Sequence, residues 1–392
     1  MQRGPGLWKT IRMTMANRIL ALSTLVLAAI CTGGAANTSA PTVGLIRVPN
    51  GGIQPQVVEQ GGIVHLLYFS GEAEHGDLNY VRSRDYGKTF STPLKVNTPG
   101  SAIAVGNIRG AQMAIGRNGR VHVAWNGSTG GDMAPMLYSR LNAAGTAFEP
   151  ERNVISSAWG LNGGGSLAAD ALGNVYVFWH APEPDKKGEE NRRVWMAKST
   201  DDGKTFAKET IAFRQEVGVC GCCGMRAFAG ADGAIRVLFR SAFETVHRDM
   251  YLLTSTDQGR TFQGANISKW NIGACVMSLE SFVQTPNGTL AAWETEKQVY
   301  FGKVTADGVA SPIGAPGTGA NRKYPAMAAN ARGETLLVWT DDMAWKKGGS
   351  VAWQVYGQDL KPEATAGKAE GVPVWSVVGA FAKPDGSFVV VY

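Results

Sequence analysis

The sequence lacks an apolar run long enough to cross a membrane. Its N-terminal apolar stretch, residues 19–30, is only twelve residues long, whereas a spanning helix needs about 20. Four basic residues and no acidic residue precede this stretch, and small residues follow it up to Ala36. This is the pattern of a secretory signal peptide. We therefore expect residues 1–36 to be a signal peptide, the protein to be periplasmic or secreted, and no stable membrane span.

The chain also lacks a strong excess of charge. It has 38 Lys and Arg against 32 Asp and Glu, and four of the basic residues lie in the expected signal peptide, which leaves 34 against 32. A nearly neutral chain has no electrostatic reason to bind nucleic acid or an anionic membrane. We therefore expect no nucleic-acid partner, and the sequence indicates no particular protein partner.

Glycine, by contrast, is abundant, with 50 residues in 392. Seven glycines each open a short apolar run, and six of these runs place an aromatic residue six positions after the glycine. In the seventh run the aromatic residue, Trp293, comes five positions after it. A further apolar run precedes each glycine, so each pair of runs is typical of a β-hairpin. The seven runs read GIVHLLY, GRVHVAW, GNVYVFW, GAIRVLF, GTLAAW, GETLLVW and GSFVVVY, and they begin at Gly62, Gly119, Gly173, Gly233, Gly288, Gly333 and Gly386.

A second strand pair with its own turn signature separates these hairpins. Three turn segments read S-x-D-x-G-x-T-F, at residues 83–90, 199–206 and 255–262. The repeat has a period of about 45 to 60 residues with four strands per unit, which is the size of one propeller blade. The chain is therefore predicted to be all-β, with one β-propeller domain over residues 37–392. We favour seven four-stranded blades over six, with residues 42–49 lending an outer strand to the last blade.

The S-x-D-x-G-x-T-F pattern resembles the Asp box, or BNR repeat, of the sialidase superfamily. The resemblance covers essentially the whole chain after the expected signal peptide. It implies that Asp85, Asp201 and Asp257 tie the turns between the third and fourth strands and are structural. It also implies a glycan or other small-molecule ligand. A sialidase uses an arginine triad for the substrate carboxylate, a tyrosine nucleophile paired with a glutamate, and an aspartate acid/base.

That catalytic set is only partly matched in this sequence. Ile53 stands where the first-blade arginine of the superfamily is expected, and Glu280 resembles its glutamate slightly out of register. Several arginines near the starts of the predicted inner strands would surround an anionic ligand, although propeller arginines are often satisfied by backbone carbonyls instead. The candidate catalytic residues of a glycoside hydrolase of the exo-sialidase type, with a rearranged active site, are Glu280, Arg109, Arg226 and Arg322.

Sulfur is scarce except in one segment. The chain has five cysteines, and three of them lie with a methionine within six consecutive residues, Cys220, Cys222, Cys223 and Met225. Cys220 and Cys275 each lie thirteen residues before a repeat glycine, so they share one register in adjacent blades. Cys222 and Met277 share the register eleven residues before the same glycines. Since neighbouring inner strands are close at the channel mouth, we expect this sulfur cluster to converge there.

Two interpretations of the cluster remain open. Export through an oxidising compartment permits a disulfide from Cys275 to Cys220, Cys222 or Cys223. Alternatively, thiolates together with the Met277 thioether would bind a soft metal such as Cu(I), because this ligand set selects soft ions. The sequence therefore favours a ligand-binding or soft-metal/redox propeller, with the glycoside hydrolase as the alternative.

Overall fold

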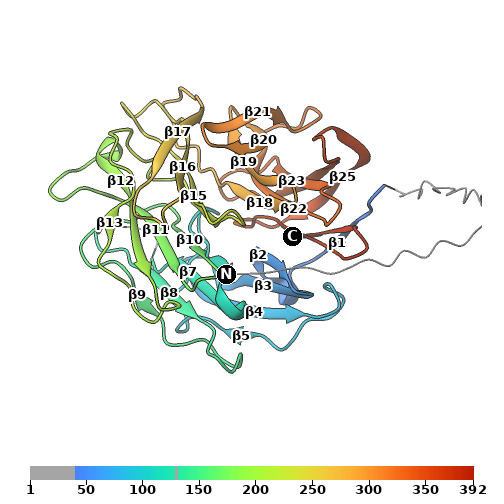
Figure 1. Ribbon diagram of the computed structural model, residues 1–392, viewed down its shortest axis with the longest axis horizontal. Coiled ribbons are helices and arrows are strands. Elements are labelled where there is room, and N and C mark those ends of the chain that lie inside the picture. Colours follow the sequence, from blue (N-terminus) through green and yellow to red (C-terminus); the bar gives the residue numbers. More distant parts are fainter. Residues whose placement is uncertain (1–39, 129–130) are drawn as a thin grey trace, which may run out of the picture. The chain divides into compact units, whose positions relative to one another are not determined.

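The computed structural model describes residues 40–128 and 131–392, which form seven β-sheets (Figure 1). The expected signal peptide, residues 1–36, lies outside the described residues. Three short 3-10 helices accompany the strands, η1 (Pro49–Gly51), η2 (Arg117–Gly119) and η3 (Glu189–Asn191). In the part of the chain that the structure describes, no helix is long and apolar enough to cross a membrane.

The strands are arranged blade by blade in chain order. Blade 1 contains β2 (Ile53–Gln60), β3 (Ile63–Glu72), β4 (His75–Ser83) and β5 (Leu94–Lys95). Blade 2 contains β6 (Gln112–Ile115), β7 (Val121–Asn126), β8 (Met136–Arg140) and β9 (Arg152–Asn153). Blade 3 contains β10 (Ser166–Ala169), β11 (Val175–Pro182), β12 (Arg192–Ser199) and β13 (Thr210–Ile211). Blade 4 contains β14 (Met225–Ala229), β15 (Ile235–Arg240), β16 (Met250–Ser255) and β17 (Gln263–Ser268).

The remaining three blades complete the ring. Blade 5 contains β18 (Ser281–Thr285), β19 (Gly288–Thr295), β20 (Gln298–Thr305) and β21 (Gly308–Gly314). Blade 6 contains β22 (Lys323–Ala329), β23 (Thr335–Asp341), β24 (Gly349–Tyr356) and β25 (Pro362–Val372). Blade 7 contains β26 (Gly379–Ala382), β27 (Phe388–Val391) and β1 (Val43–Ile46).

The first strand of each blade lies at the centre of the ring. These inner strands contact one another in sequence from β2 through β6, β10, β14, β18 and β22 to β26, and β26 contacts β2. The fourth strands β5, β9, β13, β17, β21 and β25 lie at the rim (Figure 1). The prediction of seven blades rather than six is therefore confirmed.

The seventh blade closes the ring by joining the two ends of the domain. Strand β1 pairs with β27 in parallel, with Val43 opposite Phe388, and β27 pairs with β26 in antiparallel fashion. The expected outer strand within residues 42–49 is therefore present. Among residues 40–128 and 131–392 this blade has three strands, whereas each of the other blades has four.

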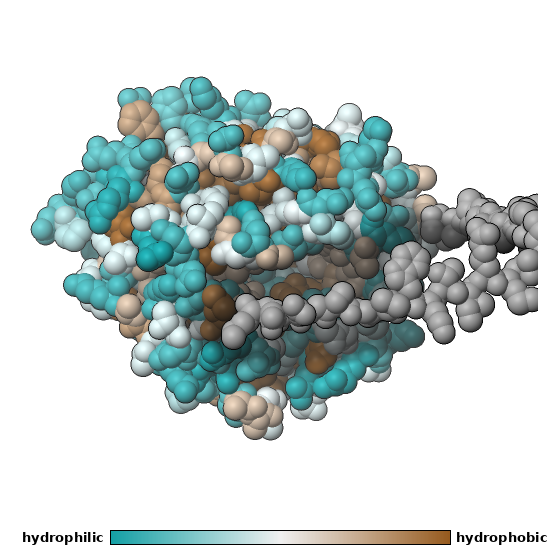
Figure 2. Space-filling view, in the orientation of Figure 1, coloured by the Kyte–Doolittle hydropathy of each residue, from teal (hydrophilic) through white to brown (hydrophobic). Residues whose placement is uncertain are grey.

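The aromatic residues that end the repeated apolar runs fill the space between blades. Trp125, Trp179 and Trp293 are each at most 1% exposed. Met136 of blade 2 belongs to the same core cluster as Trp179 of blade 3, so each blade covers the face of its neighbour. This arrangement buries large apolar surfaces between sheets. The visible surface is accordingly mainly hydrophilic, with small hydrophobic areas (Figure 2).

The S-x-D-x-G-x-T-F segments connect the third and fourth strands, as predicted, and their aspartates hold the turns. The Ser199 hydroxyl donates to Asp201 Oδ1 (2.7 Å), and the backbone N–H of Thr205 donates to the same oxygen (2.9 Å). Gly203 adopts φ +77°, a left-handed conformation that favours glycine. Although burial opposes ionisation, the hydrogen bonds from Thr205 and Ser199 lower the pKa of Asp201 to about 2. Asp85 and Asp257 make equivalent contacts.

A buried carboxylate makes the stability of the ring sensitive to acid. Glu209 is 5% exposed and accepts hydrogen bonds from the backbone N–H groups of Ser156 (3.1 Å), Ser157 (2.5 Å) and Ala158 (2.7 Å). Burial opposes its ionisation, but these bonds and the Ser156 hydroxyl lower the pKa of Glu209 to about 2. The stabilisation is therefore complete above the ordinary glutamate pKa of about 4.3 and is lost as the pH falls toward 2.

We expect Glu209→Gln to lower the free energy of unfolding at neutral pH by about 2 kcal/mol, because hydrogen bonds to a charged acceptor are lost. The difference from the unmodified protein should disappear as the pH falls toward 2. Urea unfolding at neutral and acidic pH measures both effects, with the exposed Glu72→Gln as the control. A Glu209→Gln protein that is destabilised equally at every pH would contradict this account.

Candidate functional site

The channel mouth, at the starts of the inner strands, is filled by the segment that precedes β6. The Asn107 side-chain amide donates to the backbone carbonyl of Ser376 in the connection to blade 7. Ile108 packs with Leu279 and Tyr324 of the connections to blades 5 and 6, so this segment reaches across the axis. A Cβ on Gly164 would lie 1.7 Å from the Ile108 carbonyl oxygen, so only glycine fits there. The axis is therefore closed by protein at this end.

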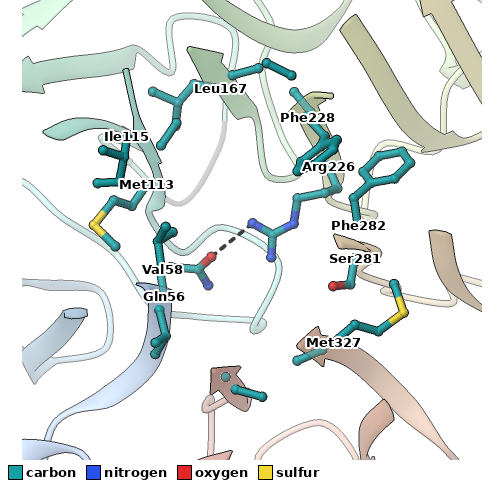
Figure 3. Close-up of a pocket in the computed structure, with 18 of the residues that line it drawn as sticks. Gln56, Val58, Met113, Ile115, Leu167, Arg226, Phe228, Ser281, Phe282 and Met327 are labelled. Atoms are coloured by element: carbon teal, nitrogen blue, oxygen red, sulfur yellow. Dashed lines mark hydrogen bonds between the residues drawn. The ribbon is translucent and has the colours of Figure 1, made fainter. Parts of the chain in front are cut away.

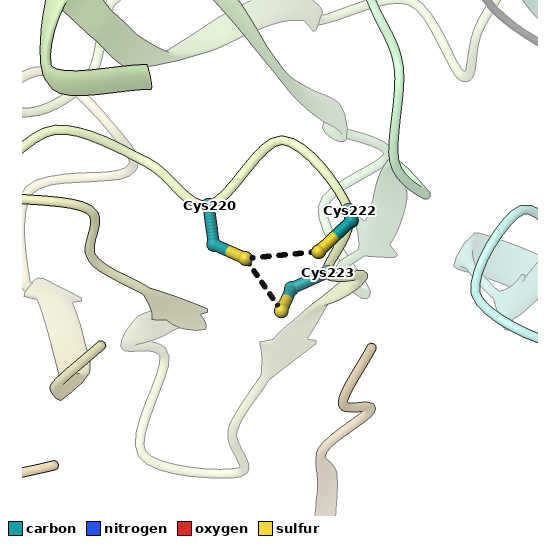
Figure 4. Close-up of side chains that lie close together, drawn as sticks. All are labelled: Cys220, Cys222 and Cys223. Atoms are coloured by element: carbon teal, nitrogen blue, oxygen red, sulfur yellow. Dashed lines mark hydrogen bonds between the residues drawn. The ribbon is translucent and has the colours of Figure 1, made fainter. Parts of the chain in front are cut away.

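The four described cysteines lie together beside this closed mouth, and Figure 4 shows three of them, Cys220, Cys222 and Cys223. Cys222 and Cys275 form a disulfide, with their Cα atoms 6.2 Å apart. Cys220 and Cys223 are free and buried, and their sulfur atoms are 2.8 Å apart. The Cys220 sulfur also lies 3.5 Å from that of Cys222. A buried dithiol thus lies against a disulfide whose other end, Cys275, is exposed.

The backbone folds the dithiol into a tight turn that is anchored by ionic contacts. The backbone N–H of Cys223 donates to the Cys220 carbonyl (3.3 Å), which brings the two side chains to the same side. Glu189 accepts a hydrogen bond from the backbone N–H of Gly221 (2.6 Å) and pairs with Arg248 (2.6 Å). The turn is therefore held from blade 3 and from blade 4.

The two thiols have opposite acidities. The hydrogen bond with Cys223, followed by burial, raises the pKa of the Cys220 thiol. Burial opposes ionisation of Cys223, but the Cys220 thiol, the Arg240 guanidinium and Ser278 stabilise its thiolate and lower its pKa. Arg240 is fully buried and donates to Ser278 Oγ (2.9 Å). The pair is therefore a thiolate at Cys223 that accepts a hydrogen bond from the thiol of Cys220.

The structure places Met277 outside the cysteine cluster. Cys220 and Cys223 pack with Trp270 and Val276, whereas Met277 packs beside a separate apolar cluster. Met277 has φ +51°, and its Cε atom would lie 3.1 Å from a Cβ on Gly106. The expected shared register with Cys222 does not bring the two sulfur atoms together, because the chain turns at this position.

The three candidate arginines lie in three separate networks. The guanidinium of Arg109 donates to the backbone carbonyl of Asn162 (2.8 Å) and to its side-chain oxygen (2.7 Å). Arg322 donates to the carbonyl of Ala315 (2.7 Å). Arg226 points into the axial channel (Figure 3). Most of their hydrogen-bonding capacity is used within the protein, and they do not form one clamp.

Glu280 is buried next to the cysteine cluster rather than in an open site. It is 1% exposed, and its Oε1 accepts a hydrogen bond from the Ser278 hydroxyl (3.2 Å). Burial raises the pKa of Glu280 to about 8 against the opposing effect of Arg240. Its carboxyl group is therefore mainly protonated at neutral pH, so little of it is present as the carboxylate that a general base requires.

Sequence reasoning missed two residues that complete this region. Glu189 holds the cysteine turn, and nothing in its surrounding sequence indicates that role. Glu294 is buried, and its backbone carbonyl accepts a hydrogen bond from Arg240. The sequence does indicate this contact. Arg240 and Glu294 each follow directly after the aromatic residue of their repeat, so they occupy equivalent positions in adjacent blades.

Comparison with known proteins identifies the fold. No protein-family model and no curated protein matches the sequence. A Hadza microbial sialidase, Hz136, has a similar structure, with a TM-score of 0.52 and 14% identity over 80% of this chain and 70% of its own.

Two further solved structures are comparably similar. The Penicillium chrysogenum α-L-arabinanase complexed with arabinobiose has a TM-score of 0.52 and 13% identity, over 80% of this chain and 95% of its own. A protein of unknown function from Dyadobacter fermentans has a TM-score of 0.53 and 14% identity, over 78% and 94%. The chain is therefore a divergent β-propeller with the sialidase-like fold.

Proposed function

We propose that this protein is an exported sialidase-like propeller that performs thiol–disulfide exchange at its cysteine cluster. The observation that carries this proposal is the sulfur geometry. The Cys220 sulfur lies 2.8 Å from that of Cys223 and 3.5 Å from that of Cys222 in the Cys222–Cys275 disulfide. Exported proteins keep disulfides because their compartment is oxidising.

The first step transfers the disulfide inward. The Cys223 thiolate takes the proton of Cys220, and the Cys220 thiolate that results attacks the Cys222 sulfur. The Cys220–Cys222 bond forms as the Cys222–Cys275 bond breaks, and Cys275 leaves as a thiolate that water protonates. Because Cys220 is the weaker acid of the pair, this proton transfer is uphill, so the Cys220 thiolate is a minor species that the attack on Cys222 consumes.

The second step stores the disulfide in the buried pair. Cys223 loses its proton again and attacks the Cys220 sulfur, which releases Cys222 as a thiolate. Cys220 and Cys223 are then oxidised, while Cys222 and Cys275 are reduced, so the electrons balance without an external oxidant. The exposed Cys275 is the contact point for an external protein dithiol or disulfide, which would exchange with the relay there.

Disulfide mapping tests the relay. The purified protein is held at neutral pH, quenched in acid, alkylated and digested, and its disulfide-linked peptides are identified by mass spectrometry. We expect both Cys222–Cys275 and Cys220–Cys223 linkages in the unmodified protein. Cys220→Ser should contain only Cys222–Cys275, because the attacking sulfur is absent.

A matched variant separates the two steps. Cys223→Ser keeps Cys220 but removes both the base of the first step and the attacking sulfur of the second. At alkaline pH, where hydroxide replaces that base, it should contain Cys220–Cys222 alongside Cys222–Cys275. If the unmodified protein contains only the Cys222–Cys275 disulfide after incubation at neutral pH, the exchange proposal is wrong.

A soft-metal site is the second candidate, because the sulfur atoms of Cys220, Cys222 and Cys223 all lie within 4.8 Å of one another. Three thiolates suit Cu(I), but in the disulfide form Cys222 is not a thiolate. Absence of exchange together with Cu(I) that stays bound to the reduced protein through desalting would favour this candidate over the relay.

The sialidase-like fold by itself also suggests a glycoside hydrolase-like or ligand-binding role. The closed mouth, the separated arginines and the mainly protonated Glu280 give the hydrolase alternative less support than the sulfur geometry gives the relay.

A further inference from the structure

A cavity of about 240 Å³ lies on the axis of the ring and is lined by all seven inner strands (Figure 3). Its walls combine apolar side chains, among them Val58, Met113, Ile115, Leu167, Phe228 and Phe282, with polar backbone and side-chain atoms. Arg226 is the only charged residue among those that line it in the described part of the chain. A cavity that combines apolar side chains with a few convergent polar groups is the usual form of a small-molecule site.

The guanidinium of Arg226 is held in place by neutral oxygen atoms. Its Nε donates to the backbone carbonyl of Glu280 (3.1 Å), and its Nη1 donates to the side-chain oxygens of Gln56 (3.0 Å) and Gln112. Within residues 40–128 and 131–392, Nη2 has no hydrogen-bond partner, and Figure 3 shows the guanidinium pointing into the cavity. Arg226 is therefore oriented with one edge free.

The positive charge of Arg226 is not neutralised by the protein. No carboxylate of the described residues lies within ion-pair distance of it. The nearby Glu280 is mainly protonated at neutral pH, because burial raises its pKa to about 8. Arg226 itself stays charged, since burial lowers its pKa only to about 10. Arg226 is partly buried and makes no ion pair within the described residues, so its charge favours an anion in the cavity.

We propose that the axial cavity binds a short-chain carboxylate, with the carboxylate on the free edge of Arg226 and an unbranched apolar tail along the channel. The Nη2 N–H groups of Arg226 are free to donate to a carboxylate oxygen, and such charge-assisted hydrogen bonds are strong. The cavity volume of about 240 Å³ is roughly eight times the ~30 Å³ that one water occupies in the liquid. A ligand of the size of hexanoate therefore fits.

The ligand reaches this site from the face opposite the cysteines. Ile108 closes the channel at the mouth, where the inner strands begin. The cavity lining continues to Gln60, Ile115, Ala169 and Ala229, at the far ends of β2, β6, β10 and β14. The carboxylate site and the cysteine relay are therefore separate, and neither proposal depends on the other.

Calorimetric titration of the purified protein with hexanoate tests the site. We expect hexanoate to bind, acetate to bind at least tenfold more weakly because it lacks the tail, and hexylamine not to bind. Arg226→Met, which keeps the length of the side chain but removes its charge, should weaken hexanoate binding at least tenfold. Arg117→Gln, an exposed control in η2, should leave binding unchanged.

A second variant tests the cavity independently, in case Arg226→Met does not fold. Ala114 also lines the cavity, so Ala114→Leu should narrow the channel and weaken hexanoate binding tenfold while acetate binding stays unchanged. No binding of hexanoate to the unmodified protein would overturn the proposal. Equal affinities for acetate and hexanoate, or unchanged hexanoate binding in Arg226→Met, would overturn it as well.

Discussion

A protein that lacks residues 387–392 is expected not to form a closed ring. These residues contain β27, the middle strand of blade 7, which pairs with both β26 and β1. Phe388 and Val390 are fully buried, and each such side chain contributes about 1.5–3 kcal/mol on burial. Loss of the strand also leaves two unpaired sheet edges. The summed loss is comparable to the whole stability of a typical domain, about 5–15 kcal/mol.

Thermal unfolding followed by circular dichroism, together with size-exclusion chromatography, measures this effect. Tyr392→Ala is the graded control, because it removes only the ring that packs against Arg47 (3.9 Å) and keeps β27. It should lower the free energy of unfolding by about 3 kcal/mol and leave a cooperative transition. A soluble truncated protein that unfolds cooperatively would show that blade 7 is not needed for closure.

Arg240→Met is expected to destabilise the protein by about 3–5 kcal/mol and to raise the pKa of Cys223. Arg240 is fully buried and donates to Ser278 Oγ (2.9 Å), to the carbonyl of Arg248 (2.6 Å) and to that of Glu294. The substitution leaves these buried acceptors without their donor, which is the costly way to break a buried charged network. It also removes a positive charge that stabilises the Cys223 thiolate.

Denaturant unfolding measures the first effect, and a pH titration of thiolate ultraviolet absorbance measures the second. Arg236→Met is the matched control, since Arg236 lies on the same strand, β15, but pairs with Asp232 away from the cysteines. It should destabilise the protein less and leave the Cys223 titration unchanged. An unchanged Cys223 titration in Arg240→Met would show that Arg240 does not set the acidity of the thiol.

The repeat and the turn chemistry could be predicted from the sequence because both depend on local interactions. Each of the seven hairpins combines a turn glycine with an aromatic residue, which follows six positions later in six of them and five positions later in the other. The contacts that hold the turn around Asp201 lie within Ser199–Thr205, so seven consecutive residues contain every group that the turn requires. The number of blades and the strand contributed by residues 42–49 follow from counting these units.

The candidate site could be predicted only in part, because its residues lie in the connections before the inner strands. No sheet ladder fixes the side-chain direction there. Cys220 and Cys275 share a register, yet Cys222 forms the disulfide with Cys275, and the turn folds Cys220 back onto Cys223. The sequence therefore determined that the sulfur-rich segment lies at the channel mouth of a propeller.

Only the tertiary structure decided which sulfur atoms meet and whether the mouth is open. The Ile108 segment closes the mouth through contacts with connections from several other blades, and such contacts leave no periodic signal along the chain. The same packing separates Arg109, Arg226 and Arg322, although each lies near the start of an inner strand. The local repeat of glycine and aromatic residues determines the blades. The packing of connections that are far apart in the sequence determines which functional side chains come into contact.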